Sequence, residues 1–298
     1  MTTVLPDGVR LDQGAGGLAR LKITTCLCTA EMYLHGAHVC RWHPHGHQHP
    51  VLWMSDRSWF ETGRPIRGGV PICFPWFGPK ADSPQASSHG VARTQAWALD
   101  AVTGEPDGTI LVRLTLTSND ISRAFYGEDF TLHYAARFGT TLDLALTVVN
   151  TGNAPMRFEE ALHTYLTVSD ARHVSVAGLG GAEYYDKTDG MKRKRQSDDA
   201  VTITGKTNRL YVDTSATVTL ADPGLERRIL IAKTGSRSTV VWNPGTARSA
   251  ALPDFGDDEW PGMTCVETVN ASDNAITLDA RQSHTMTTTV SVEPIAAG

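Results

Sequence analysis

The fold is decided by the stretch FTLHYAARFGTTLDLALTVVN, residues 130–150. Hydrophobicity repeats with a period of two through residues 130–138 and again through residues 142–150, as in strands that bury one face. Gly139-Thr140-Thr141 lies between the two runs and predicts a short hairpin connection. The stretch therefore predicts a pair of antiparallel strands.

The same period of two continues along the chain in segments rich in Val, Ile and Thr, which suit a pleated, half-buried surface. No amphipathic helix longer than two turns is evident, and residues 254–260 predict a single turn. Many short strands with frequent turns predict an all-β, antiparallel β-sandwich or barrel. Because no Pro/Gly/Ser-rich linker divides the chain, we expect residues 1–298 to form a single domain. The further strands that we expect are residues 110–117, 174–177, 201–204, 217–220, 229–233, 239–243, 275–279 and 285–292.

Composition limits the partners and the compartment. The 298 residues include 27 Lys+Arg and 32 Asp+Glu, a formal net charge of −5, so neither nucleic acid nor an anionic membrane is an expected partner. No apolar run approaches about 18 residues, which predicts no transmembrane helix, and the N-terminus lacks the pattern of a signal peptide. Five cysteines without a CxxC pair indicate reduced thiols in a cytoplasmic protein.

Three features are expected to be structural. Cys26 and Cys28 lie two apart, as small core residues on one side of a strand would. Residues 188–199, TDGMKRKRQSDD, and the polar residues 80–88 are expected to be surface loops, and the basic run in the first is expected to be solvated.

Residues 64–79, RPIRGGVPICFPWFGP, form an irregular segment that carries arginine. Gly68 and Gly69 allow positive φ or a close approach of backbone, and the prolines prevent regular ladder pairing. Such a rigid backbone can aim the Arg67 guanidinium at a carboxylate or a phosphate. The alternative is a buried strand crossing with an exposed arginine.

A second motif, SSHGVAR at residues 87–93, places His89 and Arg93 four residues apart across a glycine. Taken alone, this HGxxR pattern is a weak signal. A turn that enters a strand at residues 95–99 explains it as well.

Two strand-like segments carry groups that can transfer protons. In residues 158–168, FEEALHTYLTV, His163 and Tyr165 share a strand face, which allows a polar cleft, although a lone histidine on a strand is usually structural. Histidine titrates near neutrality and can act as general acid or base. In residues 265–270, CVETVN, Glu267 lies among apolar neighbours on its face, and burial there would raise its pKa toward a useful base value.

Residues 43–49, HPHGHQH, are a tempting metal-like pattern, because alternating histidines can bind a metal. Pro and Gly within the run indicate a hairpin tip, and no acidic or Cys ligand accompanies it, so we expect no metal site. A P-loop, GxGxxG, GxSxG and HExxH are all missing.

Taken together, these segments resemble the hexose-6-phosphate mutarotase branch of the aldose 1-epimerase superfamily. The resemblance covers most of the chain in the same order, and the first motif and the LHTY block are its most specific parts. That family has a large antiparallel β-sandwich with the sugar in a cleft on one concave face, in agreement with the period of two. The motifs are RPIRGGVPICFPWFGP, SSHGVAR, ALHTYLTVSD, YYDK, TNRLY, VVWNP, DFxxxxW and MTCVETVN.

The resemblance implies roles by position. The histidine of the family's LHTY block, its general acid, falls on His163, and the glutamate of its CVE block, its general base, falls on Glu267. The arginines of its RGG and HGxAR blocks fall on Arg67 and Arg93, which would contact substrate with the phosphate as the natural anion. His89 would lie in the same pocket.

Two candidate binding residues depart from the family pattern. Ser88 stands where members often carry Gln, and Asn208 stands where they usually carry an Asp that is expected to hydrogen-bond sugar hydroxyls. Asn keeps one acceptor and gains donors but loses the charge. The departures concern sugar binding and leave the acid–base pair intact.

The resemblance implies that the α and β anomers of an aldohexose 6-phosphate are interconverted by ring opening and reclosure, without metal or cofactor, in a monomer. Two other interpretations stay open, an epimerase for unphosphorylated aldoses and a non-catalytic carbohydrate-binding β-sandwich. The two arginines favour a phosphorylated sugar. The presence of both His163 and Glu267 argues against binding alone.

Overall fold

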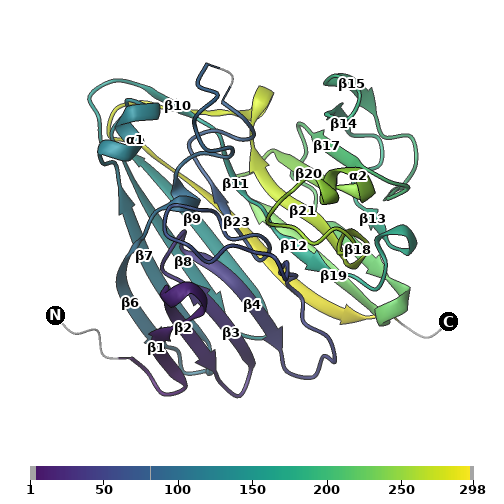
Figure 1. Ribbon diagram of the computed structural model, residues 1–298, viewed down its shortest axis with the longest axis horizontal. Helices are drawn as coiled ribbons and strands as arrows, with labels where there is room; N and C mark the ends of the chain where they lie inside the picture. The colour runs from purple at the N-terminus through teal and green to yellow at the C-terminus, as the bar shows by residue number, and fades with distance from the viewer. Residues whose placement is uncertain (1–4, 81, 296–298) are drawn as a thin grey trace.

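The strands β8 (Phe130–Phe138) and β9 (Leu142–Asn150) form the hairpin that the sequence predicts, with the predicted bounds. They belong to a computed structural model that describes residues 5–80 and 82–295 (Figure 1). Alternate residues of both strands are buried, which is the physical reason for the period of two. The strand β7 (Ile110–Thr117) also has its predicted bounds and pairs with β8.

These strands lie in a nine-stranded antiparallel sheet in the order β16-β13-β18-β19-β23-β9-β8-β7-β6. The further segments predicted at residues 174–177, 201–204, 217–220, 229–233 and 285–292 are confirmed as members of this sheet, with ends that differ by at most two residues. The members not yet given are β6 (Ala98–Gly104), β13 (Ser175–Ala177), β16 (Ala200–Thr202), β18 (Val218–Asp222), β19 (Arg227–Thr234) and β23 (Ser283–Pro294).

An eight-stranded antiparallel sheet runs in the order β15-β14-β17-β20-β21-β11-β5, and β12 also pairs with β21. All eight residues of β21 are buried, so this strand is covered on both faces. The strands are β5 (Ile72–Cys73), β11 (Glu160–Leu162), β12 (Tyr165–Thr167), β14 (Glu183–Asp186), β15 (Lys192–Arg195), β17 (Thr207–Tyr211), β20 (Ser238–Asn243) and β21 (Met263–Asn270).

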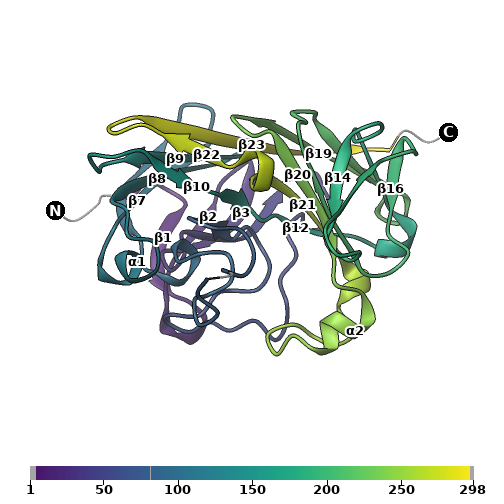
Figure 2. The ribbon, with the colours of Figure 1, turned by 90° about the horizontal axis from the view of Figure 1, so that it is seen from above.

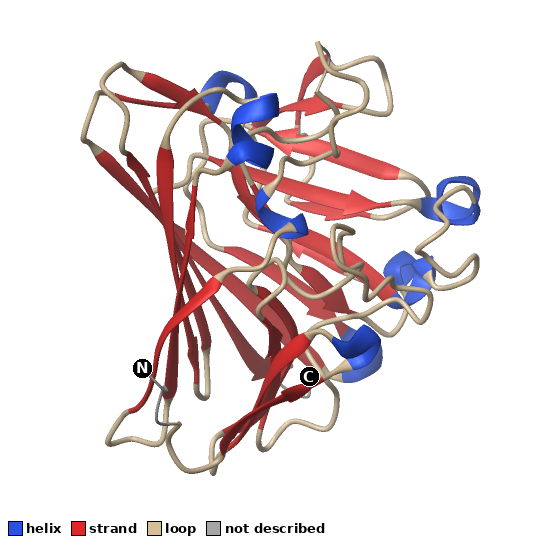
Figure 3. Ribbon diagram, turned by 60° about the vertical axis from the view of Figure 1, so that its left-hand side comes forward, coloured by secondary structure: helices blue, strands red, loops and turns tan. Residues whose placement is uncertain are grey.

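Two smaller antiparallel sheets complete the arrangement, one of four strands in the order β1-β2-β3-β4 and one in which β10 pairs with β22. The four-stranded sheet was not predicted from the sequence. Figure 3 shows how little helix there is beside the strands. The elements are β1 (Val9–Gln13), β2 (Ala19–Thr24), β3 (Cys28–Tyr33), β4 (His38–Pro44), β10 (Met156–Phe158), β22 (Ile276–Leu278) and the helices α1 (Asp120–Phe125) and α2 (Gly245–Ala250).

The sheets stack as two layers. In Figure 2 the nine-stranded sheet, with β8, β9, β23 and β19, forms one layer, and β2, β3 and β21 lie in the layer that faces it. One large apolar cluster fills the space between the layers, with contributions such as Leu21, Leu144 and Val266. Within the described residues, neither helix reaches the length and apolar character that crossing a bilayer would require.

Two local predictions were wrong, and a third was displaced along the chain. The basic run in residues 188–199 forms the edge strand β15, because its cations pair across the ladder, Arg193 with Glu183 and Lys194 with Asp186. Such charges also protect a sheet edge from further pairing. Cys26 is exposed, in the bend before β3, while Cys28 is buried as expected. Residues 254–259 form turns and bends, and a single 3-10 helical turn begins only at Trp260 (Trp260–Gly262).

Gly68 and Gly69 pack against backbone, as their sequence suggested. Both have positive φ, and a Cβ on Gly69 would lie 2.2 Å from the carbonyl oxygen of Val39. Gly68 and the next residue after the pair, Val70, bridge neighbouring segments, since Gly68 pairs with Met54 and Val70 pairs with Val39. The backbone next to Arg67 is therefore held by a close backbone contact that only glycine permits.

We predict that Gly69→Ala destabilises the fold far more than Gly63→Ala. Both glycines have positive φ, which costs an L-residue about 1–2 kcal/mol. Only Gly69 has backbone within reach of the new methyl group, and the clash adds about 1–3 kcal/mol. Urea unfolding measures both variants, and equal losses of stability would show that the close contact is unimportant.

Candidate active site

A cavity of about 440 Å³ opens on the outer face of the eight-stranded sheet. Strands β17, β20 and β21 supply part of its wall, and the loop between β5 and β6 closes it. All seven candidate site residues from the sequence line this one cavity, although they are spread over 200 positions of the chain. They are Arg67, Ser88, His89, Arg93, His163, Asn208 and Glu267.

His163, in the short gap between β11 and β12, faces Glu267 of β21. Leu162 pairs with Thr268 and Tyr165 pairs with Cys265, so the register places His163 opposite Glu267. Side chains directly opposite on paired strands are close neighbours, and His163 Nε2 lies 3.4 Å from Glu267 Oε1. Both side chains are nearly buried, at 6% and 1% exposed.

The strand faces are those that the sequence predicted. Leu162 and Leu166 point into the main core, whereas Tyr165 lies in a separate aromatic cluster on the outer face with Cys265. The His163 ring stacks on Tyr165, with ring centroids 4.8 Å apart and an angle of 15° between the planes. The pair is therefore held against a rigid aromatic wall.

Burial shifts the two pKa values in opposite directions. Burial, followed by the charges of Arg93 and Arg67, holds the pKa of His163 well below its ordinary value. Burial raises the pKa of Glu267 well above its ordinary value, although Lys187 and Arg93 oppose the shift. Without a ligand, the pair therefore favours a neutral imidazole beside a protonated carboxyl group, with one exchangeable proton between them.

His89 is a neutral hydrogen-bond donor. The Gly78 N–H donates to His89 Nδ1 at 3.2 Å, so the neutral ring carries its proton on Nε2. Burial, with Arg93 as the next cause, holds the pKa of His89 well below its ordinary value. Its ring meets that of His163 edge to face, with centroids 5.4 Å apart.

The Arg67 guanidinium is already paired. Nη2 and Nε donate to the Asp254 carboxylate at 3.0 and 3.2 Å, and Nη1 donates to the Tyr165 hydroxyl at 2.9 Å. Since its charge is matched and three of its nitrogens have partners, Arg67 suits a sugar hydroxyl better than a phosphate. Sequence analysis noted the Asp254-Phe255 motif but gave Asp254 no role.

Arg93 is in the opposite situation. Its side chain is 5% exposed, Nη2 donates to the Ser88 carbonyl oxygen at 2.7 Å, and Nε has no hydrogen-bond partner. No carboxylate among residues 5–80 and 82–295 forms an ion pair with it, and burial lowers its pKa. A buried charge without a counter-ion is costly, so this position is suited to an anionic ligand.

A family profile described as aldose 1-epimerase matches residues 20–291. The chain belongs to the aldose 1-epimerase family. A Salmonella typhimurium protein named "Putative glucose-6-phosphate 1-epimerase" is 37% identical over 243 residues, covering 82% of this chain and 80% of that protein. The Escherichia coli protein of the same name is 35% identical over 255 residues, covering 86% and 84%.

Solved structures agree with this assignment. The crystal structure of "a putative mutarotase" from Salmonella typhimurium matches with a TM-score of 0.90 and 32% identity, covering 98% of this chain and 96% of that one. A galactose mutarotase-like protein from Clostridium acetobutylicum matches with a TM-score of 0.76 at 13% identity, covering 96% and 98%, and so shares the fold. The predicted all-β antiparallel sandwich is confirmed, and this member of the aldose 1-epimerase family is an enzyme of the isomerase class.

Three further cations line the cavity and were not assigned from the sequence. Lys187 is half-buried, with Nζ 4.5 Å from the Phe77 ring centroid, and Lys206 and Arg248 are exposed. None of the three forms an ion pair with another residue in the described part of the chain. Lys187 ends the YYDK motif and Lys206 precedes TNRLY, whereas nothing in the sequence around Arg248 pointed to this cavity.

Asn208 and Ser88 contribute differently to the cavity. The backbone carbonyl of Asn208 accepts from the Lys187 N–H at 2.9 Å, and its half-buried side chain lines the cavity. The Ser88 carbonyl oxygen holds Arg93. The Asn208 amide is therefore placed to meet a ligand, and Ser88 acts through its backbone.

Among the described residues, one group could hold a metal ion: the donor atoms of His163, Cys265 and Glu267 lie within 4.8 Å of one another. Burial raises the pKa of Cys265 well above its ordinary value, and the surrounding cations repel a divalent ion. In the 43–49 run, His43 Nε2 contacts the His47 carbonyl oxygen at 2.7 Å, and His45 Nδ1 contacts the Cys26 carbonyl oxygen at 3.0 Å. These imidazole nitrogens serve the local turn.

We expect Glu267→Gln to stabilise the protein at neutral and alkaline pH. The folded state binds the Glu267 proton more tightly than the unfolded chain does, so wild-type stability falls as pH rises from the ordinary carboxyl pKa toward the raised one. The variant lacks this loss. Its free energy of unfolding should exceed that of the wild type by about 0.5–2 kcal/mol, the usual size of a stabilising substitution. Denaturant unfolding at about pH 4 and pH 8 measures the difference, which should shrink at the lower pH, where a carboxyl group of ordinary pKa is also protonated.

Proposed function

We propose that the protein is a glucose-6-phosphate 1-epimerase, which interconverts the α and β anomers of an aldohexose 6-phosphate. The observation that carries the proposal is the acid–base pair of His163 and Glu267 in a cavity that also holds the buried, unpaired Arg93. Relatives with that printed name support the same activity. The five free cysteines suit a reducing compartment, and we place the protein in the cytoplasm.

In the reaction that we propose, Glu267 takes the proton of the C1 hydroxyl while protonated His163 gives one to the ring oxygen. The electrons of the C1 O–H bond form the carbonyl, and the bond between C1 and the ring oxygen breaks. Rotation about C1–C2 then exposes the other carbonyl face, and closure with reversed proton transfers gives the other anomer. The pair begins and ends each cycle with one proton, so water, metal and cofactor supply nothing to the balance.

The phosphate prepares the pair for this chemistry. Without substrate the proton favours Glu267, because nearby cations disfavour an imidazolium at His163. A phosphate dianion bound at Arg93 offsets that positive charge and raises the His163 pKa. The proton then has only the 3.4 Å contact from Glu267 Oε1 to His163 Nε2 to cross.

Sugar and phosphate use different parts of the cavity. The paired Arg67 and Asp254, together with Asn208, present neutral or balanced groups to the sugar hydroxyls. Arg93 supplies the buried charge for the phosphate. Lys206 and Arg248, exposed at the cavity, attract the anion and make its capture sensitive to salt.

A second candidate is an epimerase for unphosphorylated aldoses. The internal Arg67–Asp254 pair favours it, because a charge-balanced group can serve any sugar hydroxyl. The unpaired Arg93 argues against it, since a neutral sugar leaves that buried charge uncompensated.

We predict that Glu267→Gln and His163→Ala each lower the rate of anomer interconversion by about 10²–10⁴-fold, the usual worth of one positioned acid or base. The rate is followed by NMR on freshly dissolved α-glucose 6-phosphate, with circular dichroism as the check on folding. A folded variant that keeps more than about a tenth of the activity would refute the role assigned to that residue.

The phosphate assignment predicts a change of specificity. Arg93→Ala should lower kcat/KM for glucose 6-phosphate relative to that for glucose by about 10–150-fold, the equivalent of a charge-assisted hydrogen bond of about 1.5–3 kcal/mol. Using the ratio of the two substrates cancels any effect on the acid–base pair that both share. Arg93→Lys should restore the preference only in part, because an ammonium cannot reproduce the guanidinium fork.

Arg67→Ala is the matched control for this measurement. Its charge is paired with Asp254, so its loss should weaken the use of both sugars by similar factors. If Arg93→Ala also reduces both equally, or if the wild type handles glucose as well as its phosphate ester, the epimerase for unphosphorylated aldoses becomes the better proposal.

A further inference from the structure

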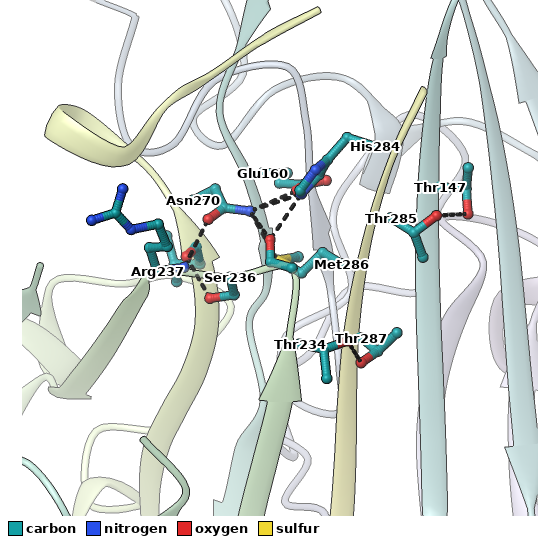
Figure 4. Close-up of polar contacts among 12 residues, drawn as sticks. Thr147, Glu160, Thr234, Ser236, Arg237, Asn270, His284, Thr285, Met286 and Thr287 are labelled. Atoms are coloured by element: carbon teal, nitrogen blue, oxygen red, sulfur yellow. Dashed lines mark hydrogen bonds and ion pairs between the residues drawn. The ribbon is translucent and has the colours of Figure 1, made fainter. Parts of the chain in front are cut away.

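The strands β11 and β21, beside the acid–base pair, carry a second polar cluster on their other face. Glu160 lies three residues before His163, and Asn270 lies three residues after Glu267. Residues three apart on a strand point to opposite faces, so these two side chains point away from the cavity, toward the nine-stranded sheet. Glu160 and Asn270 are register partners, and His284 of β23 meets them there (Figure 4).

The three side chains are joined at one carboxylate oxygen. Asn270 Nδ2 donates to Glu160 Oε1 at 2.9 Å, and His284 Nε2 lies 3.2 Å from the same oxygen. Asn270 Nδ2 and His284 Nε2 also reach the Gly235 carbonyl oxygen, both at 2.8 Å, and the Arg237 N–H donates to Asn270 Oδ1 at 3.0 Å. The cluster thus ties β11, β21, β23 and the turn between β19 and β20 to one point.

Stability alone does not explain this cluster. Glu160 is 0% exposed, and its Oε2 has no hydrogen-bond partner. Burial raises the pKa of Glu160, and the hydrogen bond to Glu160 raises the pKa of His284. Apolar residues of similar volume often give a fold as much stability as a buried ionic group of this kind, or more. We therefore look for the contribution of this cluster in how it positions the strands.

The acid–base pair needs such support because the regular strand pairing is broken beside it. The strand β11 ends at Leu162 and β12 begins at Tyr165, so His163 and Thr164 belong to neither strand. The His163 N–H donates to the Pro71 carbonyl oxygen at 3.0 Å, outside the strand pair. Within the gap, the Val266 N–H donates to the Thr164 carbonyl oxygen at 3.2 Å. The position of His163 relative to Glu267 therefore depends on this one bond and on the pairs at either side of the gap.

We propose that Glu160, Asn270 and His284 form a positioning unit that holds His163 in register with Glu267 for proton transfer. The inference rests on the proposed function. Glu160 touches no reacting atom in this account and acts only by fixing the alignment of β11 with β21. A displacement of about 1 Å in a catalytic geometry can cost on the order of 10²-fold in rate, so a small slip of the strand pair is enough.

The test compares Glu160→Ala with Glu160→Gln. The alanine variant loses the acceptor at Oε1 and should lower kcat by about 10–100-fold while KM changes by less than about threefold, since the misplacement affects the chemical step. The glutamine variant keeps a carbonyl acceptor for Asn270 and His284 and should retain kcat within about threefold of wild type. A kcat for folded Glu160→Ala equal to that of wild type would overturn the proposal.

Asp222→Ala is the matched control for loss of a buried carboxylate. Asp222 is fully buried and accepts hydrogen bonds from the Ser169 and Leu225 N–H groups, on β18 and away from the cavity. It should lower stability without changing kcat. If it lowers kcat as Glu160→Ala does, general loosening explains both and the positioning unit is refuted.

A double-mutant cycle with Glu267→Gln separates positioning from other effects. Glu160→Ala should have almost no further effect on kcat in that background, because the pair that it aligns has already been lost. An undiminished effect there would contradict the proposal. If Glu160→Ala fails to fold, His284→Ala, whose side chain is 22% exposed, takes its place in the same cycle.

The proposed function and the positioning unit can fail independently of each other. If the wild type interconverts no aldose or aldose phosphate, the proposed function fails. The positioning unit is then tested by the ¹⁵N and ¹H shifts of the His163 imidazole, which Glu160→Ala should move and Glu160→Gln should not. Unmoved shifts in the alanine variant would overturn the inference on their own.

Discussion

The strand β21 is buried along its whole length, and most of the chemistry described above follows from that constraint. Its inner face packs in the core through residues such as Val266, and its outer face carries Glu267 under the cavity. A carboxyl group in that position cannot be surrounded by water, so its charge must be compensated by the protein or by a ligand. His163 across the ladder offers a proton acceptor at 3.4 Å instead of a fixed positive charge.

The two arginines of the cavity differ in whether the protein itself balances their charge. Arg67 is balanced by Asp254 inside the protein, and Arg93 has only a backbone carbonyl and an unpartnered Nε. In the function that we propose, this difference gives the sugar to Arg67 and the anion to Arg93, a distinction that the two sequence motifs alone do not make. Under the same proposal, a phosphate at Arg93 would affect His163 from a distance, since Arg93 is among the charges that lower the His163 pKa.

The strands of the larger sheet could be predicted from the sequence because their hydrophobic period is imposed by one buried and one half-exposed face. The seven cavity residues could be gathered because their motifs resemble, in the same order, those of the aldose 1-epimerase superfamily. Backbone reasoning alone pointed only to the paired glycines beside Arg67, and Ser88 and Asn208 had no signal apart from the resemblance. The edge strand β15 was missed because its stability comes from ion pairs across a ladder and not from a buried face.

Other features have no local sequence signal. The pairing of Arg67 with Asp254 joins positions 187 residues apart, and the link from His284 to Glu160 joins the two layers. Arg248 reaches the cavity from an exposed helix that says nothing by itself about a ligand. Each depends on tertiary distance, which one sequence read alone does not contain.

Buried polar atoms without a hydrogen-bond partner show where the fold is less stable than it could be. Buried side-chain atoms normally find a hydrogen-bond partner, and nine in the described residues do not. Five of these nine lie on β21 or on the segment paired with it, and a sixth is Arg93 Nε in the cavity. The five are on Glu160, His163, Thr264, Glu267 and Thr268.

Such a concentration on one strand pair fits the proton transfer that we propose between His163 and Glu267. Full hydrogen bonding would fix the proton on one of them, and exposure to water would weaken the influence of the neighbouring charges. The large apolar core between the two layers supplies the stability that permits this arrangement. The core thus holds the strand pair rigid, while several of its polar groups have no hydrogen-bond partner in the protein. In the function that we propose, a bound substrate supplies partners to the groups in the cavity.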